Sequence, residues 1–289
     1  MNDPFAPRDP GPLARRTAGA LVLLAACSSG CGNGSVGDPA AKPLASEFGA
    51  GSRLCDLIKP AAWENPKDTS SASCKGIPPT HDVYATGLTV VAIDTFDETS
   101  NGKSSGNYYL EDTNCAGRPF AGVTVFSPSF SPPDLRLAQG DVVDFAGNLQ
   151  EFMGPSTGAF GSCYTLPEIS GSLTFRFDGA PPAPIPIKDT DLKSYDTGRP
   201  LLGMLVKMKG SPKIIINGTA TNSGGRYTAA LNVGGGTVAS QPHITNELYD
   251  IQTLGPPLND LMTFTSVTGI VTYFYGFHIA PRSPADFEP

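Results

Sequence analysis

The chain has 289 residues, of which 33 are glycine and 28 are proline, and only 16% are charged. This composition disfavours long helices and favours short strands joined by many turns, and no segment reaches the roughly 20 apolar residues that a transmembrane helix needs. The formal net charge is −7, with an acidic excess between residues 81 and 180 that opposes phosphate binding in that part of the chain.

The N-terminal segment has the pattern of a lipoprotein signal peptide, which we place at residues 1–26. Arg15 and Arg16 supply a positive region, and residues 18–26 supply a short apolar core. Residues 24–27, Leu-Ala-Ala-Cys, match a bacterial lipobox, which is cleaved before a cysteine that is then lipidated. An ordinary secretory signal followed by a chance cysteine is the alternative.

Lipidation of Cys27 predicts that the N-terminus anchors the protein to a membrane. The residue after this cysteine is Ser28 rather than aspartate. By resemblance to enterobacterial lipoproteins, this favours the outer membrane over retention in the inner membrane. We therefore expect a cell-envelope protein that faces the periplasm or the cell surface.

Export places the remaining cysteines in an oxidising compartment, where they form disulfides. The most economical pairing joins Cys55 to Cys74 and Cys115 to Cys163, and leaves Cys31 near the anchor. Other pairings remain open, since sequence alone does not fix connectivity. Zinc binding is a weaker alternative because no Cys-x-x-Cys spacing occurs.

Residues 27–80 are predicted to form a flexible tether that contains a disulfide-closed loop. The segment is rich in Gly, Ser, Ala and Pro and has little apolar periodicity. Trp63, the only tryptophan, lies in this loop. It is expected either to cap the domain that follows or to stack on a ligand.

From residue 81 to 178 the pattern becomes that of a first β-barrel. A long first strand contains Gly87, a Pro-rich crossing follows the third strand, and a strand pair ends the unit. This order is typical of a five-stranded, partly open Greek-key barrel. The predicted strands are 83–96, 107–112, 122–126, 140–152 and one that begins at 164.

A proline-rich linker at 179–186 is followed by a second unit, residues 187–289. Its first predicted strand has Gly203 in the place of Gly87. Its last run is dense in β-branched and aromatic residues and is expected to form two antiparallel strands. The predicted strands are 201–216, 225–233, 243–251 and 263–279.

The two units share a pattern that indicates a repeat. Gly147 aligns with Gly269, and seven positions later Gly154 aligns with Gly276. Two copies of one supersecondary unit are less easily explained by chance than one.

The stretches at 140–147, 203–206 and 267–286 resemble a bacterial family, the OB-fold domains that accompany secreted endonuclease/exonuclease/phosphatase-type nucleases. The organisation also resembles that of predicted lipoproteins of Gram-negative soil bacteria. The resemblance covers most of the mature chain and includes no catalytic domain. The fold class that we predict is therefore all-β, with two tandem five-stranded OB-like Greek-key barrels after a flexible N-terminal tether.

OB-folds often bind single-stranded nucleic acid on aromatic and cationic side chains. The first unit has four Lys or Arg against twelve Asp or Glu, whereas the second has eight of each. Nucleic acid is therefore expected only on the second unit, and the alternative is that its cations are solvated edge residues. The candidate ligand-binding residues are Lys207, Lys209, Arg226, Tyr273 and Tyr275.

An acidic loop in the first unit is the only candidate metal site. It offers Asp94, Asp97, Glu98 and Asn101, oxygen ligands of the kind that calcium takes. The alternative is an ordinary turn, in which Asp and Asn are common. We expect no cofactor, with calcium as the one alternative.

Catalytic signatures are missing from the sequence, and we expect a protein that is not an enzyme. The three histidines, His81, His243 and His278, are far apart in sequence and belong to no ligand or nucleophile motif. The leading hypothesis is an exported, lipid-anchored binding or scaffolding protein with a protein or polymer ligand. The alternatives are a nucleic-acid-binding accessory protein for an extracellular nuclease or DNA-handling system, and a purely structural envelope protein.

Overall fold

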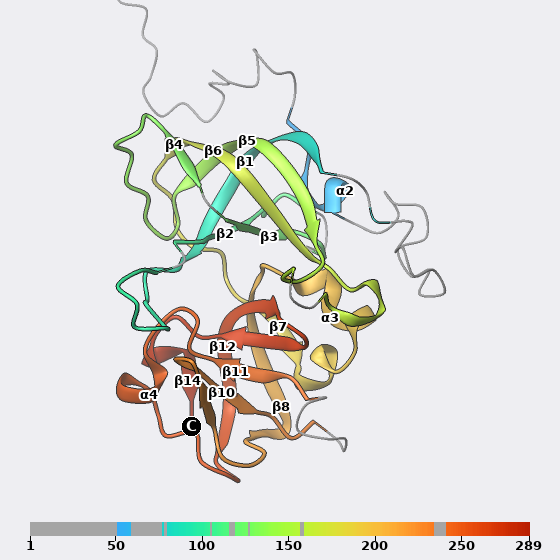
Figure 1. Cartoon of the computed structure of the whole chain (residues 1–289), viewed down its shortest axis with the longest axis vertical. Helices are drawn as coiled ribbons and strands as arrows, with labels where there is room; N and C mark the ends of the chain where they lie inside the picture. The colour runs from blue at the N-terminus through green and yellow to red at the C-terminus, as the bar shows by residue number, and fades with distance from the viewer. Residues whose placement is uncertain are drawn as a thin grey trace, which may run out of the picture. The chain divides into compact units, whose positions relative to one another are not determined.

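The structure is a computed structural model, and it describes residues 51–58, 77, 80–104, 106–115, 119–126, 128–156, 159–233 and 241–289. The signal peptide at 1–26, the lipobox cysteine Cys27, and Cys31, Trp63 and Cys74 lie outside the described residues, so predictions about them remain predictions. The described part is mostly β-structure, in two sheets that Figure 1 shows with few and short helices.

Sheet A forms a closed five-stranded barrel. The antiparallel pairings run β3-β2-β1-β5-β6, and a parallel pairing of β6 with β3 closes the ring, while β4 adds to the edge of β6. The strands are β1 (His81–Ile93), β2 (Tyr108–Glu111), β3 (Gly122–Val125), β4 (Ser129–Ser131), β5 (Val142–Phe152) and β6 (Leu166–Phe177).

The barrel forms because apolar side chains alternate along its short strands. Leu110, Val123, Val125 and Ile169 point into one buried core, while their neighbours point outward. β1 bends where Gly87 adopts φ +71° beside a shift in its register with β5. The prediction that Gly87 lies inside the first strand is confirmed, and the structure places a bulge there.

Sheet B pairs its strands in the order β7-β8-β12-β13-β11-β10-β9, with β14 added to β12. The antiparallel pair β12–β13 confirms the two strands expected at the end of the chain. The pairing of β11 with β13 is parallel, as is that of β3 with β6 in sheet A. The strands are β7 (Ile185–Lys188), β8 (Leu205–Ile215), β9 (Thr221–Ser223), β10 (Arg226–Ala230), β11 (His243–Thr245), β12 (Thr263–Tyr273), β13 (Phe277–Ala280) and β14 (Phe287–Glu288).

Two details of the second unit differ from the sequence prediction. The segment 179–186 is not wholly a linker, because its last residues begin β7, which pairs in parallel with β8. Gly203 precedes β8 instead of lying inside it, and its backbone, at φ +74°, lies against Gly122 and Val123 of sheet A. A glycine is therefore needed at position 203 because two backbones approach closely there, and not because the strand has a bulge.

Short helical turns connect the strands. Most of the connection between β7 and β8 is helical, and Arg199 in this connection is buried. The turns are α2 (Leu54–Ile58), η2 (Gly161–Cys163), η3 (Asp189–Leu192), α3 (Tyr195–Gly198), η4 (Arg199–Leu201), α4 (Ile251–Leu254) and η6 (Pro284–Asp286). Within the described residues, no helix has the length and apolar character needed to cross a bilayer.

Residues 51–58 correct part of the tether prediction. The backbone NH of Ser52 donates to the carbonyl of Tyr84 on β1, and α2 buries Leu54 and Ile58 in the core of the sheet A barrel. This part of the expected tether is therefore a docked segment, because two apolar side chains at its ends gain more from burial than from solvent exposure.

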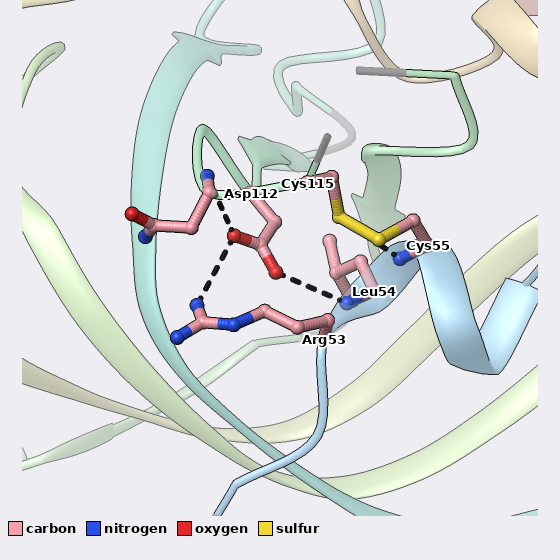
Figure 2. Close-up of a disulfide and its surroundings, with 6 residues drawn as sticks. Arg53, Leu54, Cys55, Asp112 and Cys115 are labelled. Carbon is pink, nitrogen blue, oxygen red and sulfur yellow. Dashed lines mark hydrogen bonds and ion pairs between the residues drawn. A yellow bond between two sulfur atoms is a disulfide. The ribbon is translucent and has the colours of Figure 1, made fainter. Parts of the chain in front are cut away.

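The disulfide pairing predicted from sequence is wrong. Cys55 of α2 bonds to Cys115, with a Cα–Cα distance of 6.0 Å (Figure 2). Cys163 is also disulfide-bonded, so its partner is not Cys115. The economical pairing of near neighbours failed because docking of α2 brings Cys55 beside the loop after β2.

Asp112 fixes the same junction. Figure 2 shows its carboxylate accepting from the guanidinium of Arg53 at 3.3 Å and from the backbone NH of Leu54 at 3.2 Å. Its side chain also accepts from the backbone NH of Asn114 at 3.0 Å. A buried carboxylate with three donors is well satisfied, so this residue has a structural role.

The two sheets meet through a small apolar cluster. Tyr109 and Ala92 of sheet A pack with Leu205, Ile270 and Ala280 of sheet B. These residues point away from the interiors of their own sheets. The facing surfaces of sheets A and B are therefore apolar where they touch. Their polar side chains surround a cavity.

Candidate functional site

A cavity of about 400 Å³ lies between sheets A and B. Its wall combines carboxyl, hydroxyl, imidazole, guanidinium and aromatic side chains from eight strands and the loops beside them. The lining residues are Glu98, Asn107, Tyr109, Thr124, Phe152, Leu166, Glu168, Arg226, Thr228, His243, Thr245, Glu247, Thr272, Tyr273, Phe274 and His278. This mixture and volume are typical of a site for a small molecule.

Strand alternation places the polar side chains in the cavity. In β3, Thr124 stands between Val123 and Val125, which both belong to the barrel core. In β13, His278 stands between two residues of the sheet B core, Phe277 and Ile279. Because successive side chains of a strand point to opposite faces, the polar residue of each triplet points toward the other sheet.

Glu247 is held inside the cavity by two hydroxyl groups. The phenol of Tyr109 donates to one of its carboxylate oxygens, and the hydroxyl of Thr272 donates to the other at 3.1 Å. Burial raises the pKa of Glu247, although these hydrogen bonds favour the charged form. Tyr109 belongs to β2 of sheet A and Glu247 to the loop after β11 of sheet B, so this contact also links the two units.

The carboxylate of Glu168 on β6 receives fewer hydrogen bonds than that of Glu247. Its carboxylate accepts from the side-chain amide of Gln150 at 3.2 Å. Burial raises its pKa to about 7, and the negative charge of Glu151 adds to the effect. A group with this pKa changes its charge near neutral pH, so the charge of the cavity depends on pH.

The guanidinium of Arg226 is held in the wall by a carboxylate and an aromatic ring. Its guanidinium donates to the carboxylate of Glu98 at 3.0 Å and lies 4.8 Å from the centre of the Phe274 ring. Among the described residues that line the cavity, Arg226 is the only lysine or arginine. The wall therefore contains three glutamates and one guanidinium.

His243 and His278 lie side by side, although they are far apart in sequence. They are register partners in the parallel pair β11–β13, and their ring centroids are 5.6 Å apart. Burial lowers the pKa of His243, and burial together with His243 lowers that of His278 to about 3. Both rings are therefore neutral near neutral pH, and they offer hydrogen bonds rather than charge.

Thr124 carries a buried hydroxyl that has no hydrogen-bond partner among the described residues. The residue is 3% exposed and lines the cavity. Leaving a buried hydroxyl unsatisfied costs free energy. A hydroxyl in such a position indicates a place where a ligand group completes the hydrogen bonding.

The candidate residues predicted from sequence do not form one surface. Lys207 is ion-paired with Glu288, and Lys209 follows on the same strand, β8. Arg226 and Tyr273 line the cavity.

Tyr275 is 50% exposed at the turn between β12 and β13, where its ring contacts those of Phe160 and Phe274. Tyr273 packs edge-on against Phe160 in the same aromatic cluster. The aromatic candidates therefore lie together in one cluster, whereas the lysine candidates lie on β8, where Lys207 is ion-paired with Glu288 of β14.

The acidic loop at 94–101 is organised as a turn. The carboxylate of Asp97 accepts from the backbone NH groups of Asn101 at 3.1 Å and Gly102 at 2.6 Å, and Glu98 bonds Arg226. Asp94 is buried at the start of the loop. In the described part of the chain, no group of three or more His, Cys, Asp or Glu side chains is arranged to hold a metal ion.

The functional residues that sequence reasoning missed are Thr124, Glu168, Glu247 and the histidine pair. A usable signal was present, since Thr124, Glu168 and His278 each stand directly before or between apolar residues that face a core. The sequence does not show that the outer faces of sheets A and B pack against each other. No family model, curated protein or solved structure matches this chain.

Proposed function

We propose that this protein is an exported, lipid-anchored, non-enzymatic binding protein that holds a small polar ligand in the cavity between two OB-like barrels. The observation that carries the proposal is the cavity itself, whose wall places buried carboxyl, hydroxyl and imidazole groups around a volume of about 400 Å³. Pockets of this size, with a few convergent polar groups, are the usual form of a small-molecule site.

The OB-like interpretation is supported by the order of pairings in both sheets. In sheet A, the first strand pairs with the second and fourth, and the third pairs in parallel with the fifth. In sheet B, β8, β10, β11, β12 and β13 follow the same scheme, with an isolated bridge between Ile216 and Leu231 joining the first strand to the second.

If both units are OB-like, their usual binding faces line one shared cavity. In this fold the face of the second and third strands binds the ligand, and here Tyr109 and Thr124 come from those strands of sheet A while Thr228 and His243 come from those of sheet B. A shared site of about 400 Å³ favours a small ligand over a long nucleic-acid strand.

The charges of the wall support a small ligand over nucleic acid. Carboxyl groups outnumber guanidinium groups, which disfavours phosphate.

A cavity-filling variant tests the proposal. Thr228→Trp adds an indole to the wall, and Thr265→Trp adds the same group at an exposed position of β12 outside the cavity. The purified mature chain is screened against a broad library of small polar metabolites by thermal shift and native mass spectrometry.

We expect at least one ligand to stabilise the parent chain and the Thr265→Trp variant but not the Thr228→Trp variant. Circular dichroism checks that both variants fold. Ligands that bind all three proteins equally, or a library that yields none, would contradict the proposed cavity function.

A further inference from the structure

We propose that the cavity ligand is a small organic cation, an amine or ammonium compound, whose charge is neutralised by Glu168 and Glu247. This inference rests on the proposed function, since it names the ligand class of the same cavity. It follows from how the wall of the cavity distributes its charges, rings and hydroxyl groups.

The wall already contains one example of the contact that we propose. Arg226 lies between a carboxylate, Glu98 at 3.0 Å, and an aromatic ring, Phe274 at 4.8 Å from its centre. A carboxylate and a ring face together bind cations well, because the ring adds a quadrupole attraction to the ionic one. This pair is internally complete and leaves no charge for a ligand to neutralise.

Among the described residues, no lysine or arginine is ion-paired with Glu168 or Glu247, although the charge of Arg226 acts favourably on Glu247. Glu168 accepts only an amide hydrogen bond from Gln150 at 3.2 Å, and the acidic side chain of Glu151 acts on it unfavourably. Glu247 is hydrogen-bonded by the neutral hydroxyls of Tyr109 and Thr272. A positively charged ligand would supply the counter-charge that these two side chains lack.

The other groups of the wall suit the same ligand. The aromatic side chains of Phe152 and Tyr273 line the cavity and can flank the carbon chain of an amine. The hydroxyl of Thr124, which is buried without a partner among the described residues, can accept a hydrogen bond from an ammonium group. The two neutral histidines add further acceptors and no competing positive charge.

An anionic ligand fits this wall poorly. It would face Glu98, Glu168 and Glu247, and the guanidinium of Arg226 is engaged by Glu98. A neutral polyol could use the hydroxyl and imidazole groups but would leave the carboxyl groups uncompensated. The charge of the ligand is therefore the property that the structure specifies.

Three probes with the same carbon chain length separate these possibilities: putrescine, butanediol and succinate. Binding is measured by isothermal titration calorimetry on the full mature chain in two buffers of different ionisation enthalpy. We expect putrescine to bind more tightly than butanediol and succinate not to bind. We also expect putrescine to release protons near neutral pH, because a cation favours the ionised form of Glu168.

Glu168→Gln is the test variant, and Asp134→Asn is its control, since it removes the same charge from an exposed position outside the cavity. Glu168→Gln should weaken putrescine binding at least about tenfold and reduce proton release, because hydrogen bonds to charged groups are strong and Glu247 remains as the second carboxyl group. Asp134→Asn should change neither.

The proposal is overturned if putrescine does not bind, or if butanediol binds equally well and Glu168→Gln has no effect. In either case the proposed cavity function is judged separately, by the library screen and the Thr228→Trp variant. Binding of butanediol that Thr228→Trp abolishes would reject the cation but keep the cavity.

Discussion

Two glutamates on neighbouring strands have opposite surroundings. Glu151 of β5 accepts from the Arg199 guanidinium at 3.0 and 3.1 Å and from the Thr165 hydroxyl at 2.7 Å. Glu168 of β6, the register partner of Gln150, has one amide donor at 3.2 Å. Burial raises the pKa of both carboxyl groups, but only the carboxylate of Glu151 is ion-paired with a buried guanidinium.

The comparison separates a carboxylate that holds the fold together from one that lines the cavity. Arg199 also donates to the carbonyl of Ile58, so the Glu151 pair holds β5, α2 and the connection before β8 together. Among the described residues, Glu168 bonds only to Gln150, and it lines the cavity. Buried charge that is fully paired supports the fold, whereas buried charge without a partner indicates a site.

The largest effect is expected from breaking the compensated pair. Arg199→Met leaves Glu151 buried without its cation, which typically costs about 3–5 kcal/mol of unfolding free energy. Urea unfolding monitored by circular dichroism measures this loss. The double variant Arg199→Met/Glu151→Met should recover a large part of it, and a double variant as unstable as the single one would contradict the pairing argument.

Glu168, in contrast, should destabilise the folded protein when it is ionised, so its effect on the free energy of unfolding depends on pH. The pKa of Glu168 is about 7 in the folded protein against an ordinary value of 4.5. The folded state therefore binds this proton more tightly than the unfolded state, so stability is retained below the ordinary pKa and is lost as pH rises toward and through 7.

Glu168→Gln should remove this loss. We expect the variant to match the parent chain near pH 4.5 and to exceed it above pH 7 by at most about 3 kcal/mol. Urea unfolding across this pH range checks the result. A parent chain whose stability relative to the variant rises with pH would show that Glu168 is compensated after all.

A smaller effect is expected from the hydroxyl that supports Glu151. Thr165→Val keeps the shape of a fully buried side chain but removes its hydrogen bond to the carboxylate. The loss should be about 1–3 kcal/mol, as for other hydrogen bonds to charged groups. Thr174→Val, at a partly buried position of β6, is the control, and equal losses for the two variants would remove the special role of Thr165.

The smallest effect is expected at the exposed pair of Lys207 with Glu288. Exposed ion pairs are screened by water and salt, so Lys207→Ala should leave the unfolding midpoint close to that of the parent chain. Lys207 was a candidate ligand-binding residue, and single-strand DNA binding at low salt tests that role. Salt-dependent binding that Lys207→Ala weakens would favour the nucleic-acid alternative over the cavity proposal.

Apart from β4, the positions of the strands of sheet A along the chain were predictable because their signals are local. Apolar side chains mark the strands, and Gly87 marks the bend in β1, without reference to distant residues. The same is true of β12 and β13. The disulfide was not predictable, since it depends on the docking of α2.

The candidate site was predicted less well for the same physical reason. His243 and His278 are separated by much of sheet B in the chain, and only a parallel pairing of non-adjacent strands brings them together. The contact of Tyr109 with Glu247 spans the two sheets. Aromatic and cationic residues could be identified as candidates, but the meeting of two outward faces is a tertiary property that no local pattern records.

The disulfide between Cys55 and Cys115 has a mechanical consequence. It closes a covalent ring across a sequence separation of 60, and this ring contains β1 and β2. A tensile force applied to the chain before residue 55 passes through the sulfur atoms directly to Cys115, so it does not stretch the enclosed strands. If the N-terminus is the tether that we propose, the ring shields the first strands of the barrel from any load on the anchor.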